Sequence, residues 1–159
     1  MSHFKEGPVQ GVVAKPVKKH VDQRGWLAET FRHDQLPPEF HPRMSYLSVS
    51  HPGVMRGPHE HVDQADLFVF LGPGNFKVWV WDNRKSSPTY RYRQVFYGGQ
   101  ESPLSVLIPA GVVHAYRNVS NELATVLNFP NRLFMGENYK SPIDEIRHED
   151  DPNTIFKAD

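Results

Sequence analysis

The stretch LFVFLGPGNFKVWVW, from Leu67 to Trp81, decides the fold. Two short runs rich in β-branched and aromatic residues flank GPGN, which carries the glycines and proline of a turn. In the second run Phe76, Val78 and Val80 share one face of an extended chain, because successive side chains of a strand point to opposite sides. This alternation is typical of a half-buried strand. The stretch therefore predicts two β-strands joined by a tight turn.

Four more runs of this composition lie along the chain. They are MSYLSVS (44–50), TYRYRQVFY (89–97), LSVLIP (104–109) and ATVLNF (124–129). Turn signals such as DNRKSSP (82–88) and YGGQ (97–100) separate the runs, and prolines and glycines recur too often for long helices. Many short strands at such spacing favour an antiparallel sandwich or barrel. Short helical turns are expected in DQLPPEF (34–40) and SPIDEIRHEDDP (141–152).

Composition narrows the class of protein. The chain has 159 residues, the size of one domain with a core of its own. Its 18 lysines and arginines balance 18 aspartates and glutamates without a block of like charge, so neither nucleic acid nor a membrane is expected as a partner. The absence of cysteine excludes disulfides, thiolate zinc sites and cysteine nucleophiles. No apolar run suits a signal peptide or a membrane span, and a cytoplasmic protein is expected.

Two motifs carry the candidate chemistry. The first is RGPHEHVDQAD, Arg56 to Asp66, in which His59 and His61 are two apart and would share one face of a strand. The second is PAGVVHAYRN (109–118), in which His114 follows a proline-glycine turn. HxH then Asp, followed by PxGxxHxxxN, resembles the paired motifs of the cupin superfamily of small β-barrels. The resemblance implies an all-β double-stranded β-helix, or cupin jelly-roll barrel, as a single cupin-like domain over residues 1–159.

The cupin resemblance raises the question of a metal. In metal-binding cupins two histidines and an acid of the first motif join a histidine of the second on a divalent ion, and the matching positions are His59, His61, Asp66 and His114. Imidazole and carboxylate ligands suit zinc, iron, manganese or nickel. The simpler interpretation is that two of these histidines are hydrogen-bonded residues that line the barrel. We expect no cofactor, with one divalent metal ion as the alternative.

A narrower resemblance covers most of the chain. Six segments occur in one order: DQRGWLAETFR (22–32), HPGVMRGPH (51–59), QADLFVFLGPG (64–74), WDNRKSSPT (81–89), LIPAGVVHAY (107–116) and DEIRHEDDP (144–152). This order is similar to that of dTDP-4-dehydrorhamnose 3,5-epimerases. The resemblance implies an epimerase or isomerase that removes a proton next to the ketone of a dTDP-linked keto-deoxysugar. It also implies a homodimer with crossing N-terminal strands, for which GPVQGVVAKPVKKH (7–20) is the candidate.

The epimerase resemblance also assigns roles to residues. His59 matches the general base, and Asp151, with Asp150 second, matches the carboxylate that holds this histidine. Arg24 and Arg56 match arginines that bind the diphosphate or flank the base, and a guanidinium suits phosphate through paired hydrogen bonds. The full set of expected substrate-binding residues is Arg24, Glu29, Arg56, His61, Gln64, Asp66, Asp82 and His114.

Three departures from the family pattern bear on the reaction. Asp66 occupies the place of a lysine whose positive charge would stabilise the enolate oxygen. Leu133 and Phe134 occupy the place of the tyrosine that returns the proton. Met44 and Tyr46 replace a glutamine and an asparagine of the nucleotide pocket. The replacement acids open to this chain are Tyr139, Tyr116 and Tyr46.

Two other classes of function therefore stay open from the sequence. A metal-dependent cupin enzyme, an oxygenase or a lyase, would explain Asp66, because a metal replaces the lost positive charge. A nucleotide-sugar binding protein that has lost catalysis would explain the missing tyrosine. The isomerase is the leading hypothesis, with a nucleotide sugar as the small-molecule partner.

Overall fold

The structure is a computed structural model and describes residues 4–159, of which the regular elements are nearly all strands. The strands are β1 (Lys5–Glu6), β2 (Val13–Pro16), β3 (Lys19–Asp22), β4 (Gly25–Ala28), β5 (Tyr46–Ser50), β6 (Met55–Glu60), β7 (Asp66–Phe70), β8 (Asn75–Asp82), β9 (Tyr92–Gly99), β10 (Leu104–Ile108), β11 (Val112–Asn118), β12 (Ala124–Asn128) and β13 (Ile146–Arg147). Three short 3-10 helices are η1 (His33–Gln35), η2 (Glu137–Tyr139) and η3 (His148–Asp150).

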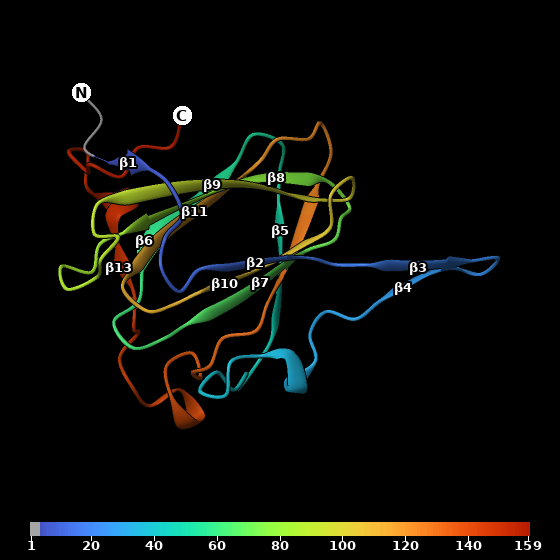
Figure 1. The fold of residues 1–159 in the computed structure, drawn as a ribbon, viewed down its shortest axis with the longest axis horizontal. Coiled ribbons are helices and arrows are strands. Elements are labelled where there is room, and N and C mark those ends of the chain that lie inside the picture. Colours follow the sequence, from blue (N-terminus) through green and yellow to red (C-terminus); the bar gives the residue numbers. More distant parts are fainter. Residues whose placement is uncertain (1–3) are drawn as a thin grey trace.

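The strands form two facing sheets and one separate hairpin (Figure 1). The larger sheet has the order β1-β9-β8-β11-β6-β13, and the smaller has the order β2-β10-β7-β12-β5. All pairs are antiparallel except β1 with β9. The crossovers between neighbours that are far apart in sequence are those of a jelly roll. The predicted all-β jelly-roll fold with a few short helical turns is confirmed.

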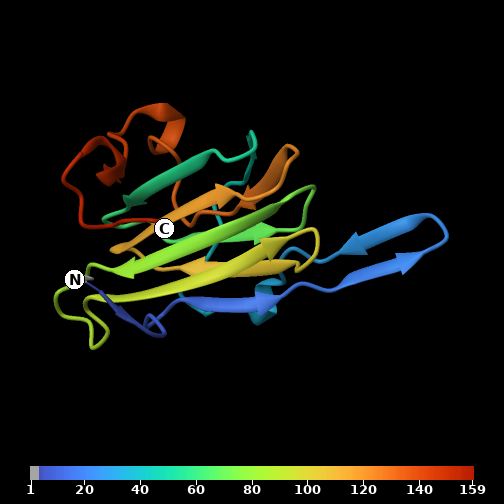
Figure 2. The ribbon, with the colours of Figure 1, turned by 90° about the horizontal axis from the view of Figure 1, so that it is seen from above.

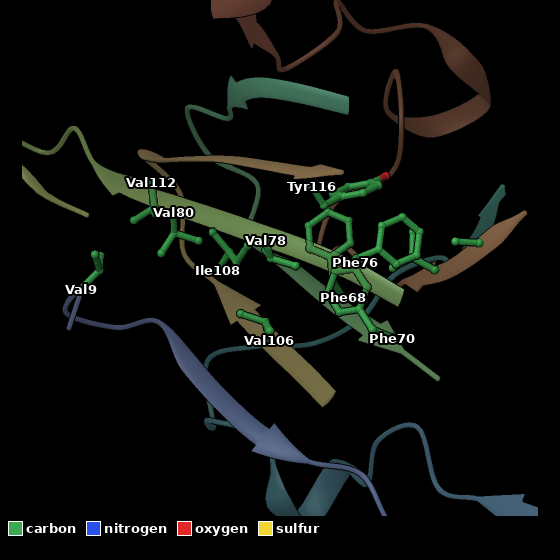
Figure 3. Packing of buried hydrophobic residues seen from close by; sticks show 12 residues of the cluster. Val9, Phe68, Phe70, Phe76, Val78, Val80, Val106, Ile108, Val112 and Tyr116 are labelled. Atoms are coloured by element: carbon green, nitrogen blue, oxygen red, sulfur yellow. The ribbon is translucent and has the colours of Figure 1, made fainter. Parts of the chain in front are cut away.

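The opening stretch of sequence forms β7 and β8, which lie in different sheets and face each other across the core. Phe68 and Phe70 of β7 pack against Phe76 of β8, with Val78 and Val80 continuing the row (Figure 3). All five side chains are buried. The turn between the two runs therefore joins the two sheets rather than neighbouring strands of one sheet.

The prediction that β8 is half-buried is wrong, because both of its faces are covered. Trp79 and Trp81 point away from the inner core, yet both are fully buried. They pack in a second cluster with Phe4 and Phe156, so the chain ends close over the outer face of the larger sheet. A strand covered on both sides needs apolar residues on both faces, which explains the continuous run from Val78 to Trp81.

The β3–β4 hairpin projects from the body of the molecule, at the end opposite β1 (Figures 1 and 2). It pairs with no other strand of the described residues. Its side chains Val21, Trp26 and Leu27 are 76%, 52% and 66% exposed. A two-stranded hairpin is marginally stable in water, and an exposed apolar patch commonly marks an interaction surface.

Candidate active site

A cavity of about 700 Å³ opens between the two sheets beside the C-terminal segment. Its volume lies within the range of small-molecule sites, about 300–1,000 Å³. Tyr46 from β5 contributes to its wall, as do His59 of β6 and Glu149 of η3. The other charged or imidazole groups on the wall are Arg56, His61, Arg132, Asp144, Glu145 and Arg147. Thus charged residues meet an apolar lining in one concave site.

His59 is positioned by three strands. It lies in β6 directly opposite His114 of β11, and Arg147 of β13 pairs with it from the other edge. Its Nδ1 atom is 3.6 Å from Glu149 Oε1 and 3.9 Å from Glu145 Oε1. Burial, together with the charge of other histidines, lowers the pKa of His59 to about 4. The ring is therefore neutral near pH 7, which is the form that accepts a proton.

The structure corrects the expected partner of His59. Asp151 is exposed, and its Oδ1 accepts a hydrogen bond from the Asn153 backbone N–H. Asp150 is also exposed and lies 3.4 Å from Arg147 Nε. Among the described residues, the carboxylates within 4.0 Å of His59 are instead those of Glu149 and Glu145. The C-terminal segment reaches the histidine as expected, but it does so a few residues earlier in the chain.

A second histidine–glutamate pair lies behind the first. Glu60 follows His59, so its side chain points to the other face of β6, where Oε1 is 2.8 Å from His148 Nε2. Asn83 Nδ2 donates to the same oxygen, also at 2.8 Å. His148 precedes Glu149, so the two neighbouring residues of β6 meet two neighbouring residues of η3. Sequence reasoning missed this crossed pairing.

His61 lies just beyond the end of β6 and has acceptors at both ring nitrogens. Its Nδ1–H donates to the backbone oxygen of Asp144, and its Nε2 is 3.1 Å from Asp66 Oδ2. Burial opposes a positive charge on this ring, but the hydrogen bonds to Asp66 and Asp144 and their negative charges together outweigh burial and raise the pKa of His61 to about 9. The cavity wall therefore carries a neutral His59 beside a cationic His61, whose two N–H groups are held by Asp66 and by the backbone oxygen of Asp144.

Asp66 begins β7 and is 1% exposed. Burial opposes its ionisation, but the hydrogen bond from His61 and its other partners lower the pKa of this carboxyl to about 2. Gln64 Nε2 and Asn128 Nδ2 donate to its Oδ1 atom at 3.0 and 2.8 Å. Asp66 is thus a buried anion that holds His61 and Asn128, not a replacement for the cation of the family pattern.

His114 is the third histidine of this cluster and is 1% exposed. Its Nδ1 is 3.2 Å from the Val112 carbonyl oxygen, and its Nε2 is 3.7 Å from Asp66 Oδ2. Burial lowers the pKa of His114 to about 3, so the ring carries one N–H for two acceptors. Its buried Nε2 has no hydrogen-bond partner within residues 4–159.

These contacts fit a divalent metal ion. One ring nitrogen from each of His59, His61 and His114 lies within 4.8 Å of the others, and Asp66 Oδ2 lies 3.1 Å from His61 Nε2 and 3.7 Å from His114 Nε2. A cation among them would resolve the conflict between a lone pair of His114 and the neighbouring carboxylate. Backbone oxygens at the Nδ1 atoms of His61 and His114 orient the rings as metal-binding histidines are usually oriented.

Five expected substrate-binding residues do not line the cavity: Asp66 and His114 are buried behind its wall, and three others lie farther away. Arg24 sits in the turn of the projecting hairpin, with its side chain 90% exposed and paired to Asp22. Glu29 lines a separate cavity of about 230 Å³. Asp82 is fully buried and accepts from Arg84, Ser87 and Thr89, so it organises a loop and binds no ligand in this cavity.

The structure adds a residue that the sequence did not single out. The carboxylate of Asp144 accepts from the backbone N–H groups of Val62, Asp63 and Gln64 at 2.7–2.9 Å. This clamp fixes the turn that carries His61 and Gln64 to the cavity. The signal in the sequence was only that Asp144 opens the motif DEIRHEDDP.

The family model for dTDP-4-dehydrorhamnose 3,5-epimerase matches residues 6–151. The chain belongs to this family. The family is one of isomerases, so the assignment made from the sequence motifs is confirmed.

Two relatives and a solved structure are similar to most of this chain. The chain is 37% identical over 147 residues to the spore coat polysaccharide biosynthesis protein SpsL of Bacillus subtilis, covering 92% of this chain and 93% of that one. It is 33% identical over 138 residues to the probable low-salt glycan biosynthesis epimerase Agl13 of Haloferax volcanii, covering 86% of each. The crystal structure of NovW, a 4-keto-6-deoxy sugar epimerase from Streptomyces spheroides, superposes with a TM-score of 0.73 at 25% identity, covering 87% of this chain and 69% of that one.

No helix among residues 4–159 is long and apolar enough to cross a membrane.

Proposed function

We propose that this protein is an epimerase or isomerase of a dTDP-linked keto-deoxysugar, with His59 as the base that removes a proton beside the ketone. The observation that carries the proposal is the setting of His59: a neutral imidazole on a cavity wall, with Nδ1 turned toward Glu149. The glutamate favours the tautomer with hydrogen on Nδ1 and leaves Nε2 to accept a proton.

The cavity suits an anionic substrate that also has apolar parts. Arg56, Arg132 and Arg147 lie on its wall, and guanidinium groups bind diphosphate through paired hydrogen bonds. Leu133 and Phe134 supply apolar contact area on the same wall. This composition supports a nucleotide sugar as the substrate class, in agreement with the family.

Incubation with dTDP-4-keto-6-deoxyglucose in deuterated water tests the proposal. We expect deuterium to enter a sugar carbon next to the ketone, and His59→Asn to abolish this exchange. His51→Asn, a histidine change on the exposed surface, serves as the matched control. Folded wild-type protein that incorporates no deuterium would contradict the proposal for this substrate.

We further propose that the protein is a homodimer in which the β3–β4 hairpin packs on a second copy. The exposed apolar side chains of the hairpin would be covered, and Arg24 would be carried toward the partner's surface. This accounts for the one arginine of the family motif that lies far from the cavity of its own chain. A cytoplasmic location stays a prediction from the sequence.

We also propose that His59, His61, Asp66 and His114 can hold one divalent metal ion, which would take the place of the proton on His61 Nε2. The unpartnered Nε2 of His114 beside a buried carboxylate favours this. When bound, the ion would act as a Lewis acid toward the enolate oxygen. His59 cannot ligate a metal and accept a proton through the same nitrogen, so the two roles compete.

Metal content measured after reconstitution with zinc, manganese, iron or nickel, on protein without a histidine tag, tests the metal site. We expect about one ion per chain, lost in His114→Asn, and a melting temperature that falls when a chelator removes the ion. Near-zero content with every metal would contradict the metal site and leave the base role of His59 in place.

A further inference from the structure

We infer that Tyr46 is the acid that returns a proton to the substrate carbon on the side away from His59. The inference rests on the proposed function and adds to it the second group that inversion at carbon requires. Removal and return of a proton by one group restores the original configuration, so an epimerase needs a donor on the other side of the carbon.

The cavity limits the candidates for this donor. Phe134 lines the cavity at the position where the family pattern has its acid, and a phenyl ring has no proton to give. Of the residues on the cavity wall, Tyr46 and Tyr139 carry hydroxyl groups. Tyr116 is 4% exposed and packs among Phe68, Phe70 and Phe76 in the core. It does not line the cavity, so it cannot donate a proton to a substrate there.

Tyr46 and His59 come from different sheets. Tyr46 begins β5, at the edge of the smaller sheet, and His59 lies in β6 of the larger sheet. Both line the same cavity, which opens between these sheets. A sugar ring bound between these two residues would have one group on each side, the arrangement that inversion requires.

The hydrogen bonds of Asn128 orient the Tyr46 hydroxyl group. Asn128 Nδ2 is 2.8 Å from Asp66 Oδ1 and 2.9 Å from the Tyr46 oxygen. The ionised carboxylate only accepts, which fixes the amide nitrogen on this side of Asn128. The Tyr46 oxygen therefore accepts from Asn128, and its own hydrogen stays available for a ligand in the cavity.

Tyr139 lacks this support. It belongs to the short helix η2, its side chain is 72% exposed, and its hydroxyl makes no hydrogen bond within residues 4–159. Tyr46 is instead anchored at the start of a strand that pairs with β12, where Asn128 is its direct partner. Burial also raises the pKa of Tyr46, which keeps its hydroxyl protonated near neutral pH.

In the proposed epimerisation, a proton leaves the substrate carbon on one side and another arrives on the other side. His59 takes the proton from the carbon beside the ketone, and the electron pair of the broken C–H bond forms a C=C bond as the carbonyl π pair moves to oxygen. The oxygen then restores the C=O bond, and the carbon takes the hydrogen of Tyr46 from the other side. His59 ends as imidazolium and Tyr46 as phenolate, and proton exchange with water resets both.

Deuterium exchange separates this role from a structural one. In deuterated water with dTDP-4-keto-6-deoxyglucose, Tyr46→Phe is expected to keep wash-in of deuterium within about tenfold of wild type, because His59 still removes and returns the proton on its own side. The inverted product is expected to fall by about 10²-fold or more, the usual contribution of a general acid. Tyr97→Phe on the exposed surface of β9 is the matched control.

Each other result overturns the inference. Inversion by Tyr46→Phe within fivefold of wild type means that Tyr46 is not the acid, and the same split in Tyr139→Phe assigns the role to Tyr139. Loss of both exchange and inversion in folded Tyr46→Phe gives the residue a binding or structural role. Wild type that neither exchanges nor inverts overturns the proposed function itself, which a defect confined to Tyr46→Phe does not.

Discussion

Glu149 Oε1 lies 3.6 Å from the Nδ1 atom of His59, while the next pair along both segments, Glu60 and His148, is joined at 2.8 Å. Two neighbouring residues of β6 thus meet two neighbouring residues of η3 in opposite order. The outer pair faces the cavity and the inner pair is buried behind it. The shorter inner contact holds η3 in place, and η3 presents Glu149 to the base.

Glu149→Gln is expected to lower kcat/KM for deuterium exchange by about 10²–10⁴-fold. An amide at this position can donate to Nδ1 and stabilise the tautomer whose Nε2 carries hydrogen, which is useless as a base. Asp151→Asn is expected to change kcat/KM less than twofold, because Asp151 caps a surface turn. The rates of deuterium exchange by the two variants measure both effects. A large loss in Asp151→Asn with a small one in Glu149→Gln would restore the assignment made from the motif.

His148→Ala is expected to lower kcat about tenfold with little change in KM, because η3 loses its anchor but no substrate contact is removed. Leaving the buried Glu60 carboxylate without this partner should also cost about 1–3 kcal/mol of unfolding free energy. Urea denaturation and steady-state kinetics measure the two effects. Asp150→Asn on the same turn removes only a surface ion pair with Arg147, and should alter neither. An unchanged kcat in His148→Ala would mean that Glu149 is positioned without it.

The sequence was enough to locate His59, but not to identify the carboxylate that lies next to it. Composition and periodicity located β5, β7, β8, β9, β10 and β12, because each strand is a short contiguous run rich in β-branched or aromatic residues. The motif around Arg56 located His59. Neither signal could choose among the carboxylates of DEIRHEDD, since this segment is largely irregular and its path is set by distant contacts.

Asp144 illustrates those distant contacts. Its carboxylate binds the backbone of residues 62–64, about 80 positions earlier, and this clamp sets which later residue reaches His59. The outer cover of β8 has the same origin, because Phe156 packs on Trp81, a residue distant in the sequence. Local propensity carries no information on such pairings.

A hairpin variant, Trp26→Ser with Leu27→Ser, is expected to convert a dimer to a monomer. Both side chains are more than half exposed on a hairpin that nothing else in the described chain covers, so their apolar area is available to a second copy. Light scattering after size-exclusion chromatography measures the mass. The matched control, Val119→Ser with Leu123→Ser, removes exposed apolar residues from another loop and should leave the dimer intact. Wild type that elutes as a monomer at micromolar concentration would contradict the proposed dimer.

Asp82→Asn is expected to destabilise the fold without altering the catalytic cavity, which Asp82 does not line. Asp82 accepts from Arg84 Nε at 2.8 Å and from the hydroxyls of Ser87 and Thr89 at 2.6 Å each. Although burial opposes its charge, these donors lower the pKa of Asp82 to about 2. Loss of the charged acceptor should cost about 1–3 kcal/mol of unfolding free energy near pH 7.

The pH dependence of this cost follows from the sign of the shift. Between about pH 2 and pH 4 the unfolded chain binds a proton at Asp82 that the folded chain does not, so stability rises with pH over this window. The contribution is fully present above about pH 4 and disappears as the pH falls toward 2. Urea denaturation should therefore separate wild type from Asp82→Asn clearly at pH 7 and progressively less below pH 4, with Asp151→Asn as the exposed control. A difference that stays constant down to pH 2 would show that the charge of Asp82 is not what holds the loop.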